Sequence, residues 1–93
     1  MPEAPYDLQK YLGGQLRYPP KAIEEGIEGR VVIKVIINEK GRITDPVVER
    51  SASKELDAEA LRVVKTLPNW KPARQNGKPV SVYYRIPVMF KIQ

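Results

Sequence analysis

The last stretch of the chain, residues 79–93, alternates strictly between apolar and mixed positions. Its odd positions are mixed, whereas the even positions are all apolar or aromatic: Val80, Val82, Tyr84, Ile86, Val88, Phe90 and Ile92. A period of two is typical of a half-buried strand, with one face in a core and one face in water. We therefore predict one long strand over residues 79–93.

Pro87 lies in the middle of this predicted strand and indicates that the strand is at an edge. Proline has no N–H for a ladder, so within sheets it is largely confined to edge strands, strand starts and bulges. In an antiparallel strand, alternate residues direct their backbone groups to opposite sides. We expect the odd residues, Pro87 among them, to face away from the strand's own neighbour. That arrangement leaves unpaired backbone groups, which form a template for another chain.

The first part of the chain predicts two short helices after a loose lead over residues 1–5. Apolar residues three and four apart indicate a helix over residues 7–16, with Asp7 as its N-cap. A proline suits the first turn of a second helix over residues 20–25, which Gly26 ends.

A hairpin is predicted next, from a strand over residues 29–38 and a second strand over residues 43–50. The first strand is apolar on one face and partly apolar on the other, which favours the centre of a sheet. Gly41 is free to take a positive φ in the turn between the strands. Pro46 lies inside the second strand and again argues for an edge.

A longer helix follows the hairpin, with Ser53 as its N-cap and Pro68 at its end. Its apolar positions share one helical face: Leu56, Ala60, Val63, Val64 and Leu67. Trp70 is expected in the core. Asn76 and Gly77 then signal a tight turn before the final strand.

These elements predict a two-layer α+β fold. We expect a three-stranded antiparallel sheet in the order 2-1-3, with the helices packed on one face. The chain is one domain overall. Within it, residues 1–17 form a lead and a helix, and residues 18–93 form the domain proper.

The composition argues against an enzyme. Histidine and cysteine are absent, so the usual general base near neutral pH, a thiolate nucleophile and most zinc ligands are missing. The aspartates Asp7, Asp45 and Asp57 lie on different predicted elements, and no glycine-rich phosphate loop is present. We expect no catalytic residue, no metal and no cofactor. No apolar run is long enough to span a membrane.

The net charge of +5 raises nucleic acid as an alternative partner. Tyr83, Tyr84 and Arg85 are the best candidates, since aromatics beside a base can stack on nucleotides. Neighbouring residues on a strand point to opposite faces, however, so only one tyrosine is available. The basic residues are also scattered singly. We therefore expect no nucleic-acid binding; a salt-dependent affinity for single strands would contradict this.

An ordered set of residues gives the chain a family resemblance that covers about Gln15 to Ile92. The set comprises Tyr18-Pro19, Ala22, Gly29, Val31, Ile33, Val35, Gly41, Ile43, Asp45, Ser51, Leu56-Asp57, Ala60, Trp70, Pro72, Gly77-Lys78-Pro79-Val80, Pro87-Val88 and Phe90. In this order they resemble the C-terminal domain of the TonB family. Single pieces are weak signals, but the ordered set is specific.

The resemblance implies a periplasmic domain of an energy transducer in Gram-negative bacteria. Such domains grip a short "box" peptide of an outer-membrane transporter, which adds as a strand beside the domain's last strand. A proton-driven motor in the inner membrane supplies the force for active uptake of siderophores and other nutrients. The implied peptide-binding edge is Arg85, Ile86, Pro87, Val88, Met89, Phe90, Lys91 and Ile92. The segment before Tyr18, namely Gln15, Leu16 and Arg17, is a further implied contact with the transporter.

The same resemblance leaves the parent protein open. The chain lacks the family's anchor helix and proline-rich spacer, so we expect an excised domain or one fused to another protein, such as a TonB-like sensor. Periplasmic tethering to the inner membrane, and contact with the motor proteins, would run through that missing part. The alternative from another class is a self-associating module, a homodimer that pairs through the same edge.

Overall fold

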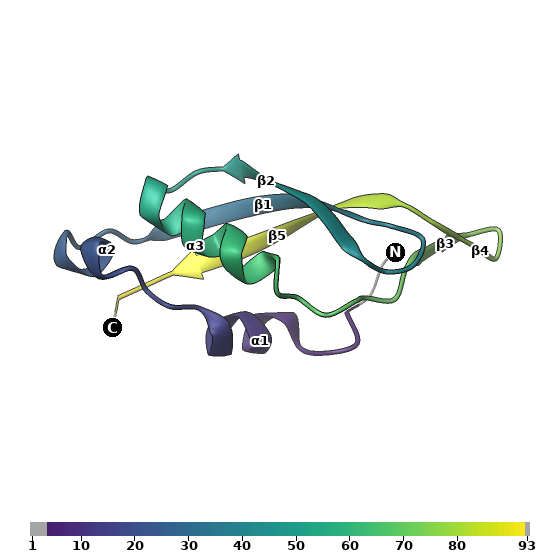
Figure 1. Cartoon of the computed structure of the whole chain (residues 1–93), viewed down its shortest axis with the longest axis horizontal. Helices are drawn as coiled ribbons and strands as arrows, with labels where there is room; N and C mark the ends of the chain where they lie inside the picture. The colour runs from purple at the N-terminus through teal and green to yellow at the C-terminus, as the bar shows by residue number, and fades with distance from the viewer. Residues whose placement is uncertain (1–3, 93) are drawn as a thin grey trace.

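Strand β1 (Gly29–Ile37) is the centre of the fold, because both other strands of the main sheet pair with it. The computed structural model describes residues 4–92. In it, β2 (Ile43–Arg50) and β5 (Val82–Phe90) run antiparallel to β1 on opposite sides (Figure 1). The order β2-β1-β5 and the α+β class confirm the predicted fold. The molecule is elongated, with extents of 50 × 22 × 15 Å.

The central position of β1 follows from its two apolar faces. The side chains on one face are almost completely buried: Val31, Ile33, Val35 and Ile37. On the opposite face, Val32, Lys34 and Ile36 are half-buried. These side chains keep part of their surface in solvent, so this face also tolerates a lysine.

Two register shifts distort the pairing of β2 with β1. At the first, Asp45 and Pro46 of β2 stand against the single residue Val35, and Asp45 adopts a φ of 51°. One extra residue of this kind is a β-bulge, a place where a strand tolerates proline. The second shift inserts Glu49 in the same way. The edge position predicted from Pro46 is therefore confirmed.

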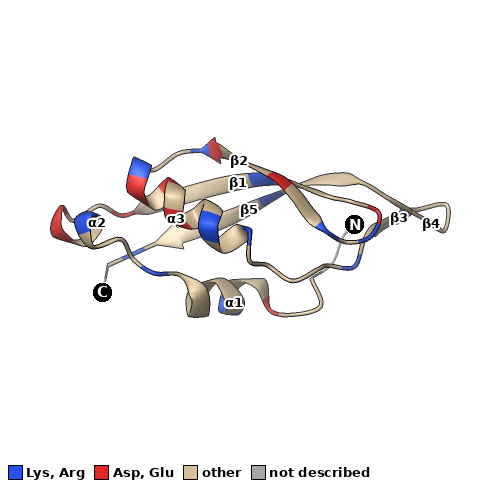
Figure 2. Ribbon diagram, in the orientation of Figure 1, with Lys and Arg blue, Asp and Glu red and all other residues tan. Residues whose placement is uncertain are grey.

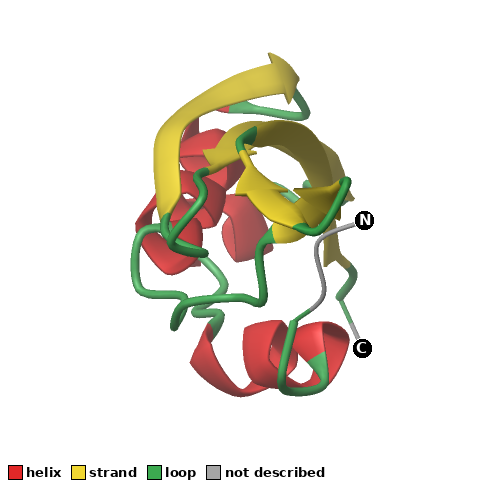
Figure 3. Ribbon diagram, turned by 90° about the vertical axis from the view of Figure 1, so that its right-hand side faces the viewer, coloured by secondary structure: helices red, strands yellow, loops and turns green. Residues whose placement is uncertain are grey.

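Helix α3 (Lys54–Val64) covers one face of the sheet and packs on β1 and β2 (Figure 3). Ser53 caps its first turn by accepting a hydrogen bond from the Leu56 N–H at 3.2 Å. The sequence predicted that the helix runs to Leu67, which is wrong: α3 ends at Val64. The N–H groups of Thr66 and Leu67 donate to the carbonyls three residues back, so the backbone turns more tightly than an α-helix before Pro68.

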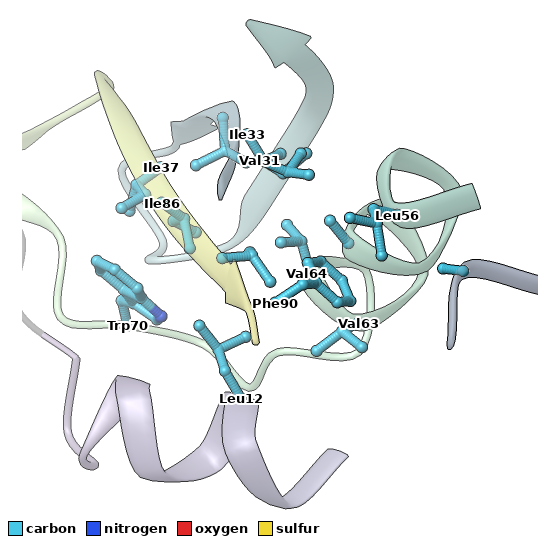
Figure 4. Close-up of a cluster of buried hydrophobic side chains, with 14 residues drawn as sticks. Leu12, Val31, Ile33, Ile37, Leu56, Val63, Val64, Trp70, Ile86 and Phe90 are labelled. Carbon is cyan, nitrogen blue, oxygen red and sulfur yellow. The ribbon is translucent and has the colours of Figure 1, made fainter. Parts of the chain in front are cut away.

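Helices α1 (Leu8–Gln15) and α2 (Pro20–Glu24) lie where the sequence predicted them, and Asp7 caps α1 through the Lys10 N–H. Leu12 of α1 is 2% exposed and belongs to the same core as the sheet and α3. Figure 4 shows it approaching the side chains of Trp70 and Phe90. Residues 1–3 and Gln93, which the predicted lead and last strand include, lie outside the described residues.

The predicted single strand over residues 79–93 is wrong in two respects: it is divided at Ser81, and it ends at Phe90, so Lys91 and Ile92 lie beyond it. Its first part is β4 (Lys78–Val80), which pairs with β3 (Ala73–Gln75) rather than with the main sheet. Asn76 and Gly77 form the predicted turn between them, with φ values of 52° and 77°. Before Ser81 the chain pairs with β3, and after it the chain pairs with β1. The Ser81 hydroxyl donates to Glu39 Oε2 at 2.8 Å.

Gly41 connects the hairpin turn to the loop after α3. It has the predicted positive φ, 81°, and its carbonyl accepts the Trp70 N–H at 2.8 Å. A Cβ at this position would lie 1.8 Å from the Trp70 carbonyl oxygen, so only glycine fits. This close approach holds Trp70 against Tyr84, with ring centroids 4.9 Å apart.

Candidate functional site

The free side of β5 is the candidate site. All nine residues of β5 pair with β1, in a register that sets Pro87 against Val32 without a bulge. In the described part of the chain, no strand lies on the other side of β5. The last strand is therefore an edge strand, as Pro87 predicted, and it is straighter than the bulged edge at β2.

The backbone just after β5 indicates which residues face outward. The N–H of Ile92 donates to Glu28 Oε2 at 2.6 Å, immediately before β1 begins. Ile92 has the same parity as Val88 and Phe90, and alternate residues of an extended chain direct N–H groups to the same side. The even residues thus direct their backbone toward β1. The odd residues, including Pro87, direct theirs to the open side, where a missing N–H breaks no bond to β1.

The side chains of the edge divide between two faces. Ile86, Val88 and Phe90 are buried on the face that α3 covers. On the other face Pro87 is half-buried, whereas Met89 is 59% exposed. Ile92 is half-buried and Lys91 is exposed, both just beyond the end of the strand. A strand added here would meet an apolar face on one side and an open face on the other.

Arg85 already forms an ion pair with a residue of another strand. Its Nε lies 2.5 Å from Glu49 Oε2 on β2, so the ion pair reaches across β1. The hydrogen bond from Arg85 lowers the pKa of Glu49. Lys91 makes no ion pair within residues 4–92. Of the two basic residues predicted at the edge, Lys91 is the one whose charge is not paired.

The segment from Gln15 to Arg17 is fastened to α3 through its backbone. Arg62 Nη2 donates to the Gln15 carbonyl at 3.0 Å, and the Arg17 N–H donates to Glu59 Oε2 at 2.6 Å. The hydrogen bond from Arg62 is the main reason that the pKa of Glu59 is lowered. These contacts fix the path of the segment past the end of β5.

The structure brings only part of the predicted site together. Leu16 shares a hollow with Met89, Phe90 and Lys91, whereas Arg17 lines a different hollow against α3. Gln15 is exposed and lines neither. Reasoning from the sequence missed Gly13 and Tyr18, which also line the first hollow.

The charges of the molecule are mixed. Figure 2 shows basic and acidic residues interspersed along the ribbon. Among residues 4–92, no group of three or more potential metal-ligating side chains occurs. None of the helices described is both long and apolar enough to cross a membrane.

The fold is an α+β domain whose last strand, β5, leaves one regular edge open to a further strand. The family model described as Gram-negative bacterial TonB protein C-terminal matches residues 14–92. The chain belongs to this family, which is one of non-enzymatic interaction domains.

Relatives of the chain carry the same family name. It is 34% identical over 82 residues to Protein TonB of Vibrio cholerae, and 30% identical over 79 residues to Protein TonB of Xanthomonas campestris. These alignments cover 85% and 82% of this chain, but 32% and 34% of the relatives. The chain thus spans about a third of the length of these relatives.

Solved structures are similar over most of their length. The solution structure of the Helicobacter pylori TonB C-terminal domain, residues 194–285 in its own numbering, has a TM-score of 0.70 and 29% identity, and the match covers 90% of this chain and 88% of that one. The Pseudomonas aeruginosa TonB C-terminal domain has a TM-score of 0.66 and 33% identity, with coverage of 84% and 79%. Both likenesses support the same fold.

Proposed function

We propose that this chain is the periplasmic peptide-binding domain of a TonB-like energy transducer. It binds the box peptide of a TonB-dependent outer-membrane transporter by β-strand addition to β5, along residues 85–92. The observation that carries the proposal is the open side of β5, in a member of a family whose full-length proteins are transducers. Main-chain bonds supply affinity in this mode of recognition, and side chains of alternate residues supply selectivity.

The backbone hydrogen bonds available along β5 are sufficient for reversible binding of a peptide. Outward N–H and C=O groups are available at four residues: Tyr83, Arg85, Met89 and Lys91. Pro87 has an outward C=O but no N–H. A backbone hydrogen bond contributes about 0.5–1.5 kcal/mol net. The gap at Pro87 therefore weakens the ladder by one bond and helps to fix the register of the peptide.

The remainder of the transducer would lie outside this chain. In this proposal an N-terminal segment anchors the parent protein in the inner membrane and contacts the proton-channel motor proteins. Force from the proton-motive force then reaches the transporter through β5 and drives nutrient uptake. The full-length gene product tests this part: it should carry a hydrophobic anchor and a proline-rich spacer ahead of residue 1.

Strand addition is tested by a backbone methylation scan. Box peptides are synthesised from the transporter genes of the bacterium that encodes this chain, and the tightest binder is methylated at one amide nitrogen at a time. Methylation at alternate positions should weaken binding, because only alternate N–H groups of an added strand face β5. If no single methyl group weakens binding, strand addition is wrong.

The same open edge also favours a second candidate, self-association through two β5 strands. Sedimentation over a concentration series separates the two candidates. A monomer that binds peptide supports the transducer domain, and a stable dimer that refuses peptide supports the self-associating module.

A further inference from the structure

One end of this elongated molecule carries almost all of its excess positive charge. This basic end is formed by two segments: the turn after β1, residues 38–42, and residues 71–80, which contain the β3–β4 hairpin. Together they hold five basic residues and one acidic residue, out of 16 and 11 in the chain, which leaves 11 and 10 for all the rest. The five basic residues are Lys40, Arg42, Lys71, Arg74 and Lys78.

The fold brings these two segments together, although they are far apart in the sequence. The Trp70 N–H donates to the Gly41 carbonyl at 2.8 Å, and the Ser81 hydroxyl donates to Glu39 Oε2 at 2.8 Å. The turn is thus fastened beside both ends of residues 71–80. Figure 1 shows the turn and the hairpin at the same end of the molecule, far from the C-terminus. The five charges therefore belong to one surface.

The charges of the basic end are exposed and held on ordered backbone. All five basic side chains are exposed, and none of them forms an ion pair within residues 4–92. The acidic member, Glu39, accepts the bond from Ser81, which lowers the pKa of Glu39. At the tip of the hairpin, Arg74 Nη1 donates to the Gly77 carbonyl at 3.2 Å and braces the turn. The surface is therefore formed before any partner binds.

The composition of the basic end favours a charged surface over a protein or a nucleic acid. The centre of a protein interface is apolar, and single-stranded nucleic acids stack on aromatic side chains. Neither segment contains an aromatic residue. The exposed large apolar side chains of the described chain all lie elsewhere: Ile23, Val47, Tyr83 and Met89. Contacts at this end are therefore electrostatic, and a second copy of the chain would bring like charges together.

We propose that the basic end is a docking surface for the phosphate headgroups of an anionic lipid layer. Each basic residue near such a layer contributes about fivefold to affinity. The contact goes beyond the proposed strand addition and needs no peptide. The pairing of β5 with β1 places Val82 beside the turn and Phe90 at the other end of the sheet, about 26 Å away. The basic end can therefore rest on lipid while residues 85–92 remain accessible.

Two double variants of equal charge test this docking surface. Lys71→Gln with Lys78→Gln removes two charges from the basic end and leaves the Arg74 bond intact. Lys10→Gln with Lys54→Gln removes two exposed charges from α1 and α3, neither of which is in an ion pair of the described chain. Thermal melts verify that both variants are folded. Co-sedimentation measures their binding to vesicles of phosphatidylcholine, with and without roughly 30% phosphatidylglycerol.

The wild-type chain should bind only the vesicles that contain phosphatidylglycerol, and should be released when NaCl rises from about 50 mM to about 300 mM. The variant of the basic end should lose about tenfold or more in affinity, and the control variant less than twofold. Equal losses would indicate a general effect of net charge and overturn the proposal. Absence of binding by the wild-type chain at low salt would overturn it as well, and would leave strand addition untouched.

Two further measurements test the make-up of the surface and the class of its partner. Lys40→Gln and Lys78→Gln, one from each segment, should each lose about fivefold in affinity for the anionic vesicles. If Lys40→Gln binds as wild type does, the two segments do not form one surface and the proposal is wrong. A single-stranded oligonucleotide should bind more weakly than the vesicles at the same salt concentration. Tight binding of the oligonucleotide through Lys71 and Lys78, without binding to vesicles, would make the basic end a nucleic-acid site instead.

Discussion

The indole N–H of Trp70 donates to the hydroxyl of Tyr6 at 2.6 Å, although the two residues are 64 positions apart. The same hydroxyl donates to the Pro68 carbonyl at 3.0 Å. Tyr11 adds a third bond, from its hydroxyl to the Thr66 carbonyl at 3.1 Å. The start of the chain is thereby tied to the loop between α3 and β3, so α1 is held as a structural part of the domain.

Tyr6→Phe should destabilise the chain by about 1–3 kcal/mol, because it leaves the indole N–H of the 5%-exposed Trp70 without its partner. Urea unfolding followed by tryptophan fluorescence measures the change. Tyr83→Phe is the matched control, since Tyr83 is 67% exposed and the same atom is removed. Equal stability of the two variants would contradict the importance of the Tyr6 bond.

Gly41→Ala should be among the most damaging single substitutions in the chain. It combines a φ of 81° with a Cβ that would meet a backbone oxygen at 1.8 Å, and we expect a loss of about 2 kcal/mol or more. Gly14→Ala, in open space on α1, should instead stabilise the helix by up to about 1 kcal/mol. Thermal denaturation of the pair gives the comparison; a Gly41→Ala variant as stable as wild type would refute the close approach.

Glu49→Gln should strengthen the binding of an acidic peptide. The substitution releases Arg85 from the ion pair that crosses β1, so its charge becomes available at the edge. We expect a gain of a few-fold at low ionic strength and a steeper dependence on salt. Fluorescence anisotropy with a labelled peptide measures both. Glu24→Gln, a change of the same charge on α2, should leave affinity nearly unchanged, and an equal gain there would show a general charge effect.

Acid should loosen the attachment of the Gln15–Arg17 segment. The hydrogen bond from Arg62 lowers the pKa of Glu59 below its ordinary value of 4.5. A carboxylate with a lowered pKa contributes stability that is present above pH 4.5 and is lost as the pH falls through its folded-state pKa. Glu59→Gln should therefore show a smaller loss of stability between pH 6 and pH 3 than wild type, by urea unfolding at each pH. If the variant and the wild type lose the same free energy of unfolding between pH 6 and pH 3, Glu59 makes no such contribution.

Local chemistry made most of the fold predictable from the sequence. Pro46 and Pro87 identified both edges because a missing N–H is a property of the residue itself, and Gly41 and Gly77 marked turns for the same kind of reason. The division at Ser81 was not predictable in this way. Val80 and Val82 keep the same alternation on both sides of it, and only the pairing with β3 or β1 distinguishes the two strands.

The candidate site was predictable along β5 but not around it. Alternation assigned Met89 and Phe90 to opposite faces correctly. The hollow beside them depends on Gly13, Leu16 and Tyr18, which meet β5 only through the packing of α1. Likewise, nothing in the order of residues pairs Arg85 with Glu49, because that contact depends on the width of the intervening strand.

The two edges of the sheet have different consequences for assembly. The bulges at Asp45–Pro46 and Glu49 make β2 a poor template for a further strand, whereas β5 is regular over its whole length. A ribbon built from main sheets would need a regular edge on both sides of each copy, and the described residues provide one, at β5. Two copies can therefore pair through their β5 strands, but the bulged β2 edges do not favour extension of that pair into a longer ribbon.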